Sequence, residues 1–155
     1  MAQHQDDCEI CRRIAECRAG THPGFIAESA TGFAVLGDSQ YFRGYCLLLC
    51  KTPATELDEL SPDVRLQYLE EMALLAQAVR EVTQPHKLNY ECLGNLVPHL
   101  HWHVFPRRQD EPEPLKPVWT CMPQGDEAAR HAFDPARDGE MLQQIRAAFL
   151  RLLAK

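Results

Sequence analysis

The stretch at residues 99–105, His-Leu-His-Trp-His-Val-Phe, constrains the fold of this chain more than any other. It places His99, His101 and His103 at alternate positions, with apolar side chains between them. Because successive side chains of a β-strand point to opposite faces, the pattern predicts a strand with imidazoles on one face and core-forming residues on the other. Three of the chain's 7 histidines on one face favour a chemical role over a merely solvated strand face.

Other strands and helices are predicted from apolar patterns and turn residues. Ser61 and Pro62 are typical of a helix start, and the apolar stripe that follows ends near Gln84. A second stripe predicts a helix from about Gly139 to Ala154, and a weaker one predicts a short helix. We expect this short helix at residues 8–19. Further strands are expected at 33–37, 45–51 and 87–93.

No regular alternation of strands and helices is present, which favours an α+β fold over a doubly wound sheet. We therefore expect an antiparallel sheet of about five strands, with the long helix packed on it and a C-terminal helix. The proline-rich, charged residues 106–135 predict an irregular loop. A chain of 155 residues that is 45% apolar suits a single domain, 1–155.

Composition limits the partners and the compartment. A formal net charge of -6, without a Lys/Arg-rich run, argues against polymeric nucleic acid. No stretch approaches the roughly 20 apolar residues of a membrane span, and the polar start MAQHQDDCEIC does not resemble an export signal. We therefore expect no membrane association, a cytoplasmic location and 7 cysteines that stay reduced.

The three histidines are compatible with two chemistries. Three neutral imidazoles can hold zinc with an open position for water, although a flat strand rarely supplies all three ligands of a tetrahedral ion. Alternatively, one imidazole attacks phosphorus while its neighbours donate hydrogen bonds, because histidine is largely unprotonated near neutral pH.

The same residues resemble the histidine triad (HIT) superfamily, whose signature is His-x-His-x-His followed by two apolar residues. The signature stands here as HLHWHVF, and LNYECLGNLVP at 88–98 and PRR at 106–108 are similar to the branch of diadenosine polyphosphate hydrolases. The resemblance runs from about Cys8 to Trp119. It implies a HIT-like domain with its core at about 8–119 and a C-terminal loop and helix at 120–155.

The resemblance implies a nucleotide hydrolase or transferase that cleaves a P–O–P or P–N bond at the α-phosphate through a nucleotidyl-histidine intermediate. His101 corresponds to the nucleophile, and His103 to the histidine that bonds phosphate or the leaving oxygen. His99 helps to shape and orient the site, and Asn89 donates to developing negative charge. The substrates implied are dinucleoside polyphosphates or related adenylyl compounds.

The resemblance also implies substrate-binding positions. Asn95 donates to phosphate, beside Leu96, which replaces a hydroxyl residue of many relatives. Asp38, or Gly37 if the alignment shifts by one, corresponds to the residue that holds the ribose hydroxyls. The base pocket is expected to be lined by Phe33 and Leu36, which are equally compatible with ordinary strand core.

Cys8 and Cys11 match a C-x-x-C pair that binds structural zinc in many bacterial relatives, together with the first triad histidine and a second histidine. Pro53 occupies the position of that second histidine here, so either the cysteine pair is vestigial or Cys17 or His4 substitutes as a ligand. The covalent step itself requires no cofactor, and magnesium is expected with the substrate phosphates. The family further implies a homodimer.

Two other functions remain open. One is a non-catalytic nucleotide-binding or adaptor protein, which Leu96 and Pro53 motivate, and the other is a three-histidine metal hydrolase. Trp119 is expected either near the substrate or as an apolar anchor. Arg107 and Arg108 are expected either to reach distal phosphates or to be solvated.

Overall fold

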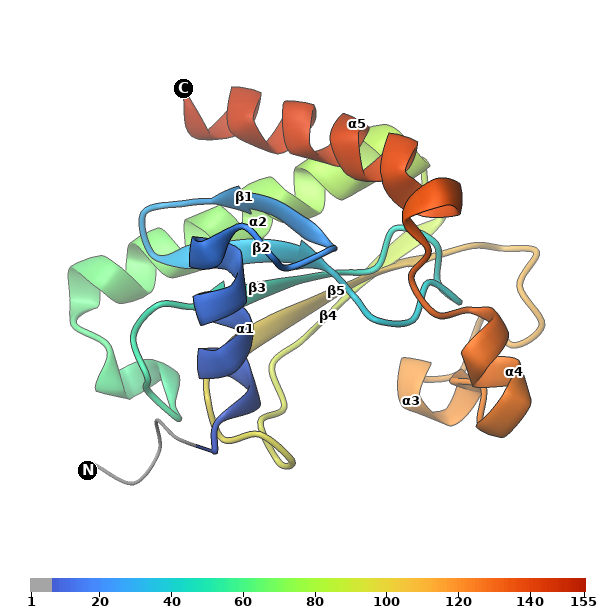
Figure 1. Cartoon of the computed structure of the whole chain (residues 1–155), viewed down its shortest axis with the longest axis horizontal. Helices are drawn as coiled ribbons and strands as arrows, with labels where there is room; N and C mark the ends of the chain where they lie inside the picture. The colour runs from blue at the N-terminus through green and yellow to red at the C-terminus, as the bar shows by residue number, and fades with distance from the viewer. Residues whose placement is uncertain (1–6) are drawn as a thin grey trace.

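The structure, a computed structural model, describes residues 7–155. At its centre lies a five-stranded antiparallel sheet with the order β1-β2-β3-β5-β4 (Figure 1). This arrangement confirms the predicted α+β class. The strands are β1 (Phe25–Glu28), β2 (Gly32–Leu36), β3 (Cys46–Cys50), β4 (Lys87–Glu91) and β5 (His101–Arg107). The sequence analysis did not single out β1, because its four residues are too few to establish an alternating pattern.

One face of the sheet is covered by α2 (Pro62–Thr83), the long helix predicted from its start at Ser61. Tyr68 on the buried side of this helix donates a hydrogen bond from its hydroxyl to the carbonyl of Leu48 in β3, at 2.8 Å. The helix ends at Gln84, whose φ of 47° is left-handed. A short 3-10 turn, η1 (Leu57–Glu59), precedes it.

The C-terminal helix α5 (Pro135–Leu153) packs on α2 and on β1. It starts at Pro135 rather than at the predicted Gly139, because Asp134 caps it: the carboxylate accepts from the backbone N–H of Ala136 at 2.8 Å. Its apolar stripe joins the core between α2 and the sheet, where Ile145 and Phe149 are fully buried.

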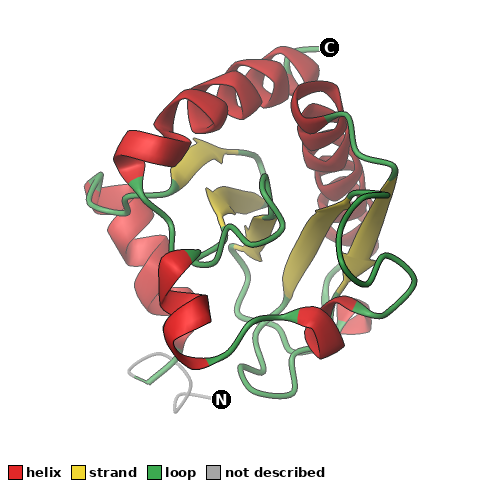
Figure 2. Ribbon diagram, turned by 90° about the vertical axis from the view of Figure 1, so that its right-hand side faces the viewer, coloured by secondary structure: helices red, strands yellow, loops and turns green. Residues whose placement is uncertain are grey.

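The opposite face of the sheet is partly covered by α1 (Glu9–Ala19), the short helix predicted at 8–19. Ile10 and Ile14 of this helix pack on a separate apolar cluster of the sheet. Figure 2 shows the strands enclosed between the helices. The cluster under α1 contains Phe33, Val35, Leu47, Leu49 and Phe105.

Residues 106–135 are largely irregular, as predicted, but they contain two short helices, α3 (Val118–Cys121) and α4 (Gly125–Arg130). Arg107, at the end of β5, is only 3% exposed, so the expectation that it reaches distal phosphates or solvent is wrong. Its guanidinium binds Asn89 Oδ1 at 2.8 Å, Glu111 Oε1 at 2.6 Å and the carbonyls of Lys116 and Glu113. No helix within residues 7–155 is long and apolar enough to cross a membrane.

Candidate active site

Strand β5 carries His101 and His103 on the face that α1 leaves partly open. In the register with β3, His101 lies opposite Leu49 and His103 opposite Leu47, both members of the cluster under α1. Leu100, which precedes His101, and Val104, which follows His103, are buried on the α2 side. The predicted alternation is thus confirmed for His101 and His103, whereas β5 begins at His101 and His99 lies before it. His99, His101 and His103 are 4%, 7% and 8% exposed, so all three imidazoles are held in the protein rather than solvated.

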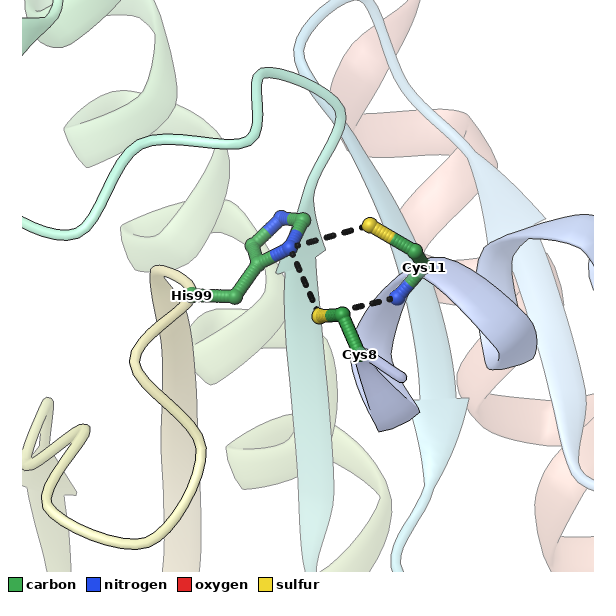
Figure 3. Close-up of side chains that lie close together, drawn as sticks. All are labelled: Cys8, Cys11 and His99. Atoms are coloured by element: carbon green, nitrogen blue, oxygen red, sulfur yellow. Dashed lines mark hydrogen bonds between the residues drawn. The ribbon is translucent and has the colours of Figure 1, made fainter. Parts of the chain in front are cut away.

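His99 precedes β5, and its ring binds the start of α1. Nδ1 lies 3.4 Å from Sγ of Cys8 and 3.5 Å from Sγ of Cys11 (Figure 3). Nε2 lies 2.8 Å from the carbonyl oxygen of Cys50. Because a carbonyl oxygen only accepts, Nε2 carries the proton and Nδ1 directs its lone pair toward the two sulfurs.

Cys8, Cys11 and His99 form a cluster whose ligand atoms all lie within 4.8 Å of one another. Cys8 is the N-cap of α1 and Cys11 lies in its first turn, so the helix holds both thiols on one side. This set of ligands suits a zinc ion: two thiols, and an imidazole whose Nε2 donates a hydrogen bond to a backbone carbonyl while Nδ1 is left for the metal. Burial and the neighbouring Cys8 raise the pKa of the Cys11 thiol to about 11, so a metal ion has to displace that proton.

Of the residues considered as a fourth ligand, Cys17 is not in this cluster. Pro53 lines a small cavity beside it, of about 260 Å³. Cys17 is on the buried side of α1, among apolar residues. The described residues within ligand distance are Cys8, Cys11 and His99 alone. His4 lies outside the described residues. The described chain therefore offers three ligands for a metal ion.

His101 is oriented by the backbone of His99. Its Nδ1 lies 2.6 Å from the His99 carbonyl oxygen and donates to it, which leaves the lone pair on Nε2. His103 lies next to it, with ring centroids 4.7 Å apart. Burial, followed by the neighbouring His101, lowers the pKa of His103 to about 4, so this ring is neutral near pH 7.

Both rings line a cavity of about 550 Å³, which we call the histidine pocket. Asp38 and Arg13 stand on one side of it, where Nη1 of Arg13 donates to Oδ1 of Asp38 at 2.8 Å. This hydrogen bond is the main reason that the pKa of Asp38 is lowered. The remaining lining residues are Glu9, Ile10, Ser39, Tyr45, Leu47, Leu93, Gly94, Asn95, Leu96, Val97, Trp119 and Met122.

The loop after β4 and the short helix α3 line the rest of the pocket. Asn95 is exposed and lines it, as does Leu96, whose side chain is 98% exposed. Gly94 turns this loop with a φ of 71°, a conformation that favours glycine. Trp119 packs edge-on against His103, and its indole N–H donates to the carboxylate of Glu91. Trp119 thus lines the pocket, which is one of the two positions that the sequence analysis expected for it.

Three expected site residues do not line the pocket. Phe33 is buried in the cluster under α1, and Leu36 is buried on the opposite face of the sheet, against α2 and α5. Asn89 lies opposite Phe105 in the register of β4 and β5. Its Oδ1 accepts from Arg107, so its amide N–H groups point elsewhere.

Among the pocket residues that the sequence analysis did not single out, Arg13 and Tyr45 contact predicted site residues. Arg13, which pairs with Asp38, lies four residues after Glu9, and a helical Glu-Arg pair of this spacing ordinarily indicates only a solvated helix face. Tyr45 approaches His103 from the residue before β3, and no periodicity in the sequence indicated that contact.

An antiparallel α+β sheet whose fifth strand presents alternate histidines to a pocket defines a protein of the histidine triad type. The model of the HIT domain family matches residues 24–110, more than half of the chain. The chain belongs to the HIT domain family, which confirms the resemblance seen in the sequence. Membership in this family implies nucleotide binding with hydrolase or transferase activity.

Individual relatives agree with this assignment. Protein hit of Bacillus subtilis is 30% identical over 108 residues, which are 66% of this chain and 72% of the relative. A histidine triad protein from Bradyrhizobium japonicum has a TM-score of 0.71 at 26% identity, covering 81% of this chain and 89% of its own.

Two more distant solved structures share the fold. A zinc-bound histidine triad family protein from Mycobacterium smegmatis has a TM-score of 0.60 at 24% identity, covering 90% of this chain and 95% of its own. The diadenosine triphosphate hydrolase of Plasmodium falciparum has a TM-score of 0.60 at 10% identity, covering 83% of this chain and 78% of its own.

Proposed function

We propose that this protein cleaves dinucleoside polyphosphates or related adenylyl compounds at the α-phosphate, through a nucleotidyl intermediate on His101. The observation that carries the proposal is the hydrogen bond from His101 Nδ1 to the His99 carbonyl. It leaves the Nε2 lone pair on a ring that lines the histidine pocket. A neutral imidazole with its lone pair toward a cavity is the nucleophile that this chemistry needs.

The reaction takes two steps. Nε2 of His101 attacks the α-phosphorus, so that a P–N bond forms while the bond to the leaving group breaks and its electron pair departs with that group. Water then attacks the phosphorus and loses a proton to solvent, the electron pair of the P–N bond returns to Nε2 of His101, and a nucleoside monophosphate is released. With another acceptor in place of water, the same intermediate supports transfer instead of hydrolysis.

Neighbouring groups serve binding and charge stabilisation. His103 is within reach of the same phosphate, because its ring lies beside that of His101. Asp38, kept ionised by Arg13, accepts hydrogen bonds from the ribose hydroxyls, and Asn95 donates to phosphate from the loop after β4. That Asn89 donates to the leaving group stays a prediction, because Asn89 does not line the histidine pocket and its Oδ1 accepts from Arg107.

The test combines turnover with trapping of the intermediate. We expect His101→Ala to abolish AMP release from diadenosine tetraphosphate while the thermal unfolding midpoint is retained, and we expect His86→Ala, at an exposed histidine, to leave the rate unchanged. Acid quenching of the wild type with radiolabelled diadenosine tetraphosphate should trap a phosphoramidate adduct. Full activity of His101→Ala eliminates the mechanism.

A non-catalytic nucleotide-binding protein is the second candidate, because the exposed Leu96 stands where relatives carry a hydroxyl residue. It predicts tight binding of the nucleotide without a trapped adduct, so the same experiment separates the two functions. A three-histidine metal hydrolase has less support. Within residues 7–155 the group with metal-ligand spacing is Cys8, Cys11 and His99, and it omits His101 and His103.

We further propose that Cys8, Cys11 and His99 hold a structural zinc ion, which would tie the start of α1 to the segment before β5. The donor set supports zinc over magnesium, since magnesium prefers oxygen ligands. Magnesium on the substrate phosphates stays a prediction. A homodimer also stays a prediction, and β4, at the edge of the sheet, offers backbone groups for such an interface.

A further inference from the structure

Tyr45 lies directly before β3 and packs its ring among the aromatic side chains of β5. The ring stacks on Phe105, with centroids 4.0 Å apart, and lies nearly parallel to His103, with centroids 5.9 Å apart. Its hydroxyl oxygen is 2.6 Å from Nδ1 of His103. Tyr45 is 6% exposed, so this contact is shielded from solvent.

The surrounding backbone holds Tyr45 in place. Gly37 N–H donates to the Tyr45 carbonyl at 2.9 Å, and the Gln40 side-chain amide donates to the same carbonyl at 3.1 Å. A Cβ atom at Gly37 would lie 2.1 Å from two carbon atoms of the tyrosine ring. The glycine therefore makes the room that this large side chain occupies.

The direction of the hydrogen bond follows from the available partners. A tyrosine hydroxyl has one hydrogen, and His103 Nδ1 is the hydrogen-bond partner of the Tyr45 hydroxyl within residues 7–155. Burial raises the pKa of Tyr45 well above its ordinary value, so the hydroxyl keeps its hydrogen. The hydroxyl accordingly donates, Nδ1 of His103 accepts, and the proton of the neutral ring lies on Nε2.

The two histidines of the pocket are thus held in opposite tautomers. The His99 carbonyl fixes the proton of His101 on Nδ1, which leaves a lone pair on Nε2. At His103 the Tyr45 hydroxyl donates to Nδ1, so the hydrogen of the neutral ring lies on Nε2. Attack on phosphorus needs this pair: a lone pair to form the bond, and beside it a donor for an oxygen that gains charge.

We propose that Tyr45 is a positioning residue, which selects the Nε2–H tautomer of His103 and thereby makes this ring a neutral hydrogen-bond donor to the phosphoryl or leaving-group oxygen. The catalytic part of the inference rests on the proposed function. The tautomer itself does not depend on it. No proton is transferred from His103 in this role, because the ring donates a hydrogen bond and stays neutral.

The decisive measurement is the tautomer of His103 in the wild-type protein, from long-range proton–nitrogen correlation spectra of protein labelled with ¹⁵N-histidine. We expect a protonated Nε2 and an unprotonated Nδ1 at His103, with the reverse at His101. A protonated Nδ1 at His103 in the wild type overturns the inference without any variant. Assignment uses His101→Gln and His103→Gln.

Tyr45→Phe then removes the hydroxyl and keeps the stacked ring. We expect His103 to become a mixture of tautomers while His101 is unchanged, and kcat to fall about tenfold with KM nearly constant, which corresponds to one hydrogen bond. Tyr41→Phe is the matched control, since Tyr41 packs on Phe42 and His131 and has no role in the pocket. We expect the control to change neither quantity.

An unchanged His103 tautomer in Tyr45→Phe overturns the inference, and an unchanged kcat overturns its catalytic part. Failure of the proposed function is recognised separately, because it appears as a wild-type protein that forms no trapped adduct. In that case the His103 spectra still decide whether Tyr45 sets the tautomer.

Discussion

The Nδ1 nitrogen of His101 donates a hydrogen bond to the backbone carbonyl of His99 over 2.6 Å. The ring of that same His99 lies against the sulfurs of Cys8 and Cys11. His99 therefore contacts His101, the proposed nucleophile, with its backbone and the cysteine pair with its side chain. We therefore expect a change at the cysteines to shift His99 and its carbonyl, which binds Nδ1 of His101.

The first prediction concerns metal. Replacing Cys8 and Cys11 together by serine should reduce bound zinc from near stoichiometric to background, because two of the three described ligands are lost. The thermal unfolding midpoint and kcat should both fall, since His99 loses its anchor. Metal analysis of purified protein, with Cys121→Ser as the control, measures the effect. Equal zinc in both variants contradicts a zinc site at this cluster.

The second prediction concerns the fit of Gly37 against Tyr45. Gly37→Ala should lower the free energy of unfolding by about 1–3 kcal/mol, because the new methyl group overlaps the tyrosine ring. Gly139→Ala is the matched control: it meets no atom within 4 Å and lies in α5. There alanine should stabilise by about 0.5–1 kcal/mol. Urea unfolding of the two variants should therefore show changes of opposite sign.

The third prediction concerns the buried guanidinium of Arg107. Arg107→Lys should cost about 2 kcal/mol of unfolding free energy, because a lysine cannot satisfy Asn89 and the loop carbonyls at once. Arg108→Lys, at the neighbouring exposed ion pair with Asp110, should change stability by less than about 0.5 kcal/mol. Similar costs in both variants would falsify the structural role of Arg107.

The fourth prediction concerns pH. The pKa of His103 in the folded protein, about 4, lies below its ordinary value of 6.5, so the unfolded chain takes up a proton at higher pH than the folded one. The stability contributed by the neutral ring is therefore present above the ordinary value and is lost as pH falls toward the folded value.

Between about pH 7 and about pH 5 this linkage amounts to about 2 kcal/mol. Denaturant unfolding at the two pH values should show the wild type losing that much more than His103→Gln, in which the titrating ring is absent. Comparing the two proteins cancels the contribution of all other groups that titrate alike. Parallel losses in both proteins count against a buried neutral His103.

The sequence was sufficient for elements with a long or strict pattern. The alternation around His101 predicted β5 and the face it presents, and the stripe after Ser61 predicted α2 almost to its last residue. Asp134 was a cap that the stripe alone did not include, so the start of α5 was placed too late. Periodicity reports the repeating interior of an element better than its ends.

Parts of the site depended on contacts between distant segments. The ring of His99 contacts cysteines that precede it by 91 and 88 residues; local pattern does not indicate this contact, and only the family resemblance led to its expectation. The burial of Arg107 likewise depends on the following loop folding back over it. Leu36 was different, because it stands an odd number of residues after Phe33, and alternation already places the two on opposite faces.

The close fit of Gly37 and Tyr45 has a consequence for the evolution of the family. A side chain at the first position excludes the aromatic ring at the second, so neither position can drift freely while the other stays fixed. Relatives with a smaller side chain at the position of Tyr45 should be the ones with a residue larger than glycine at the position of Gly37. In an alignment of relatives, substitutions at these two positions should therefore be correlated.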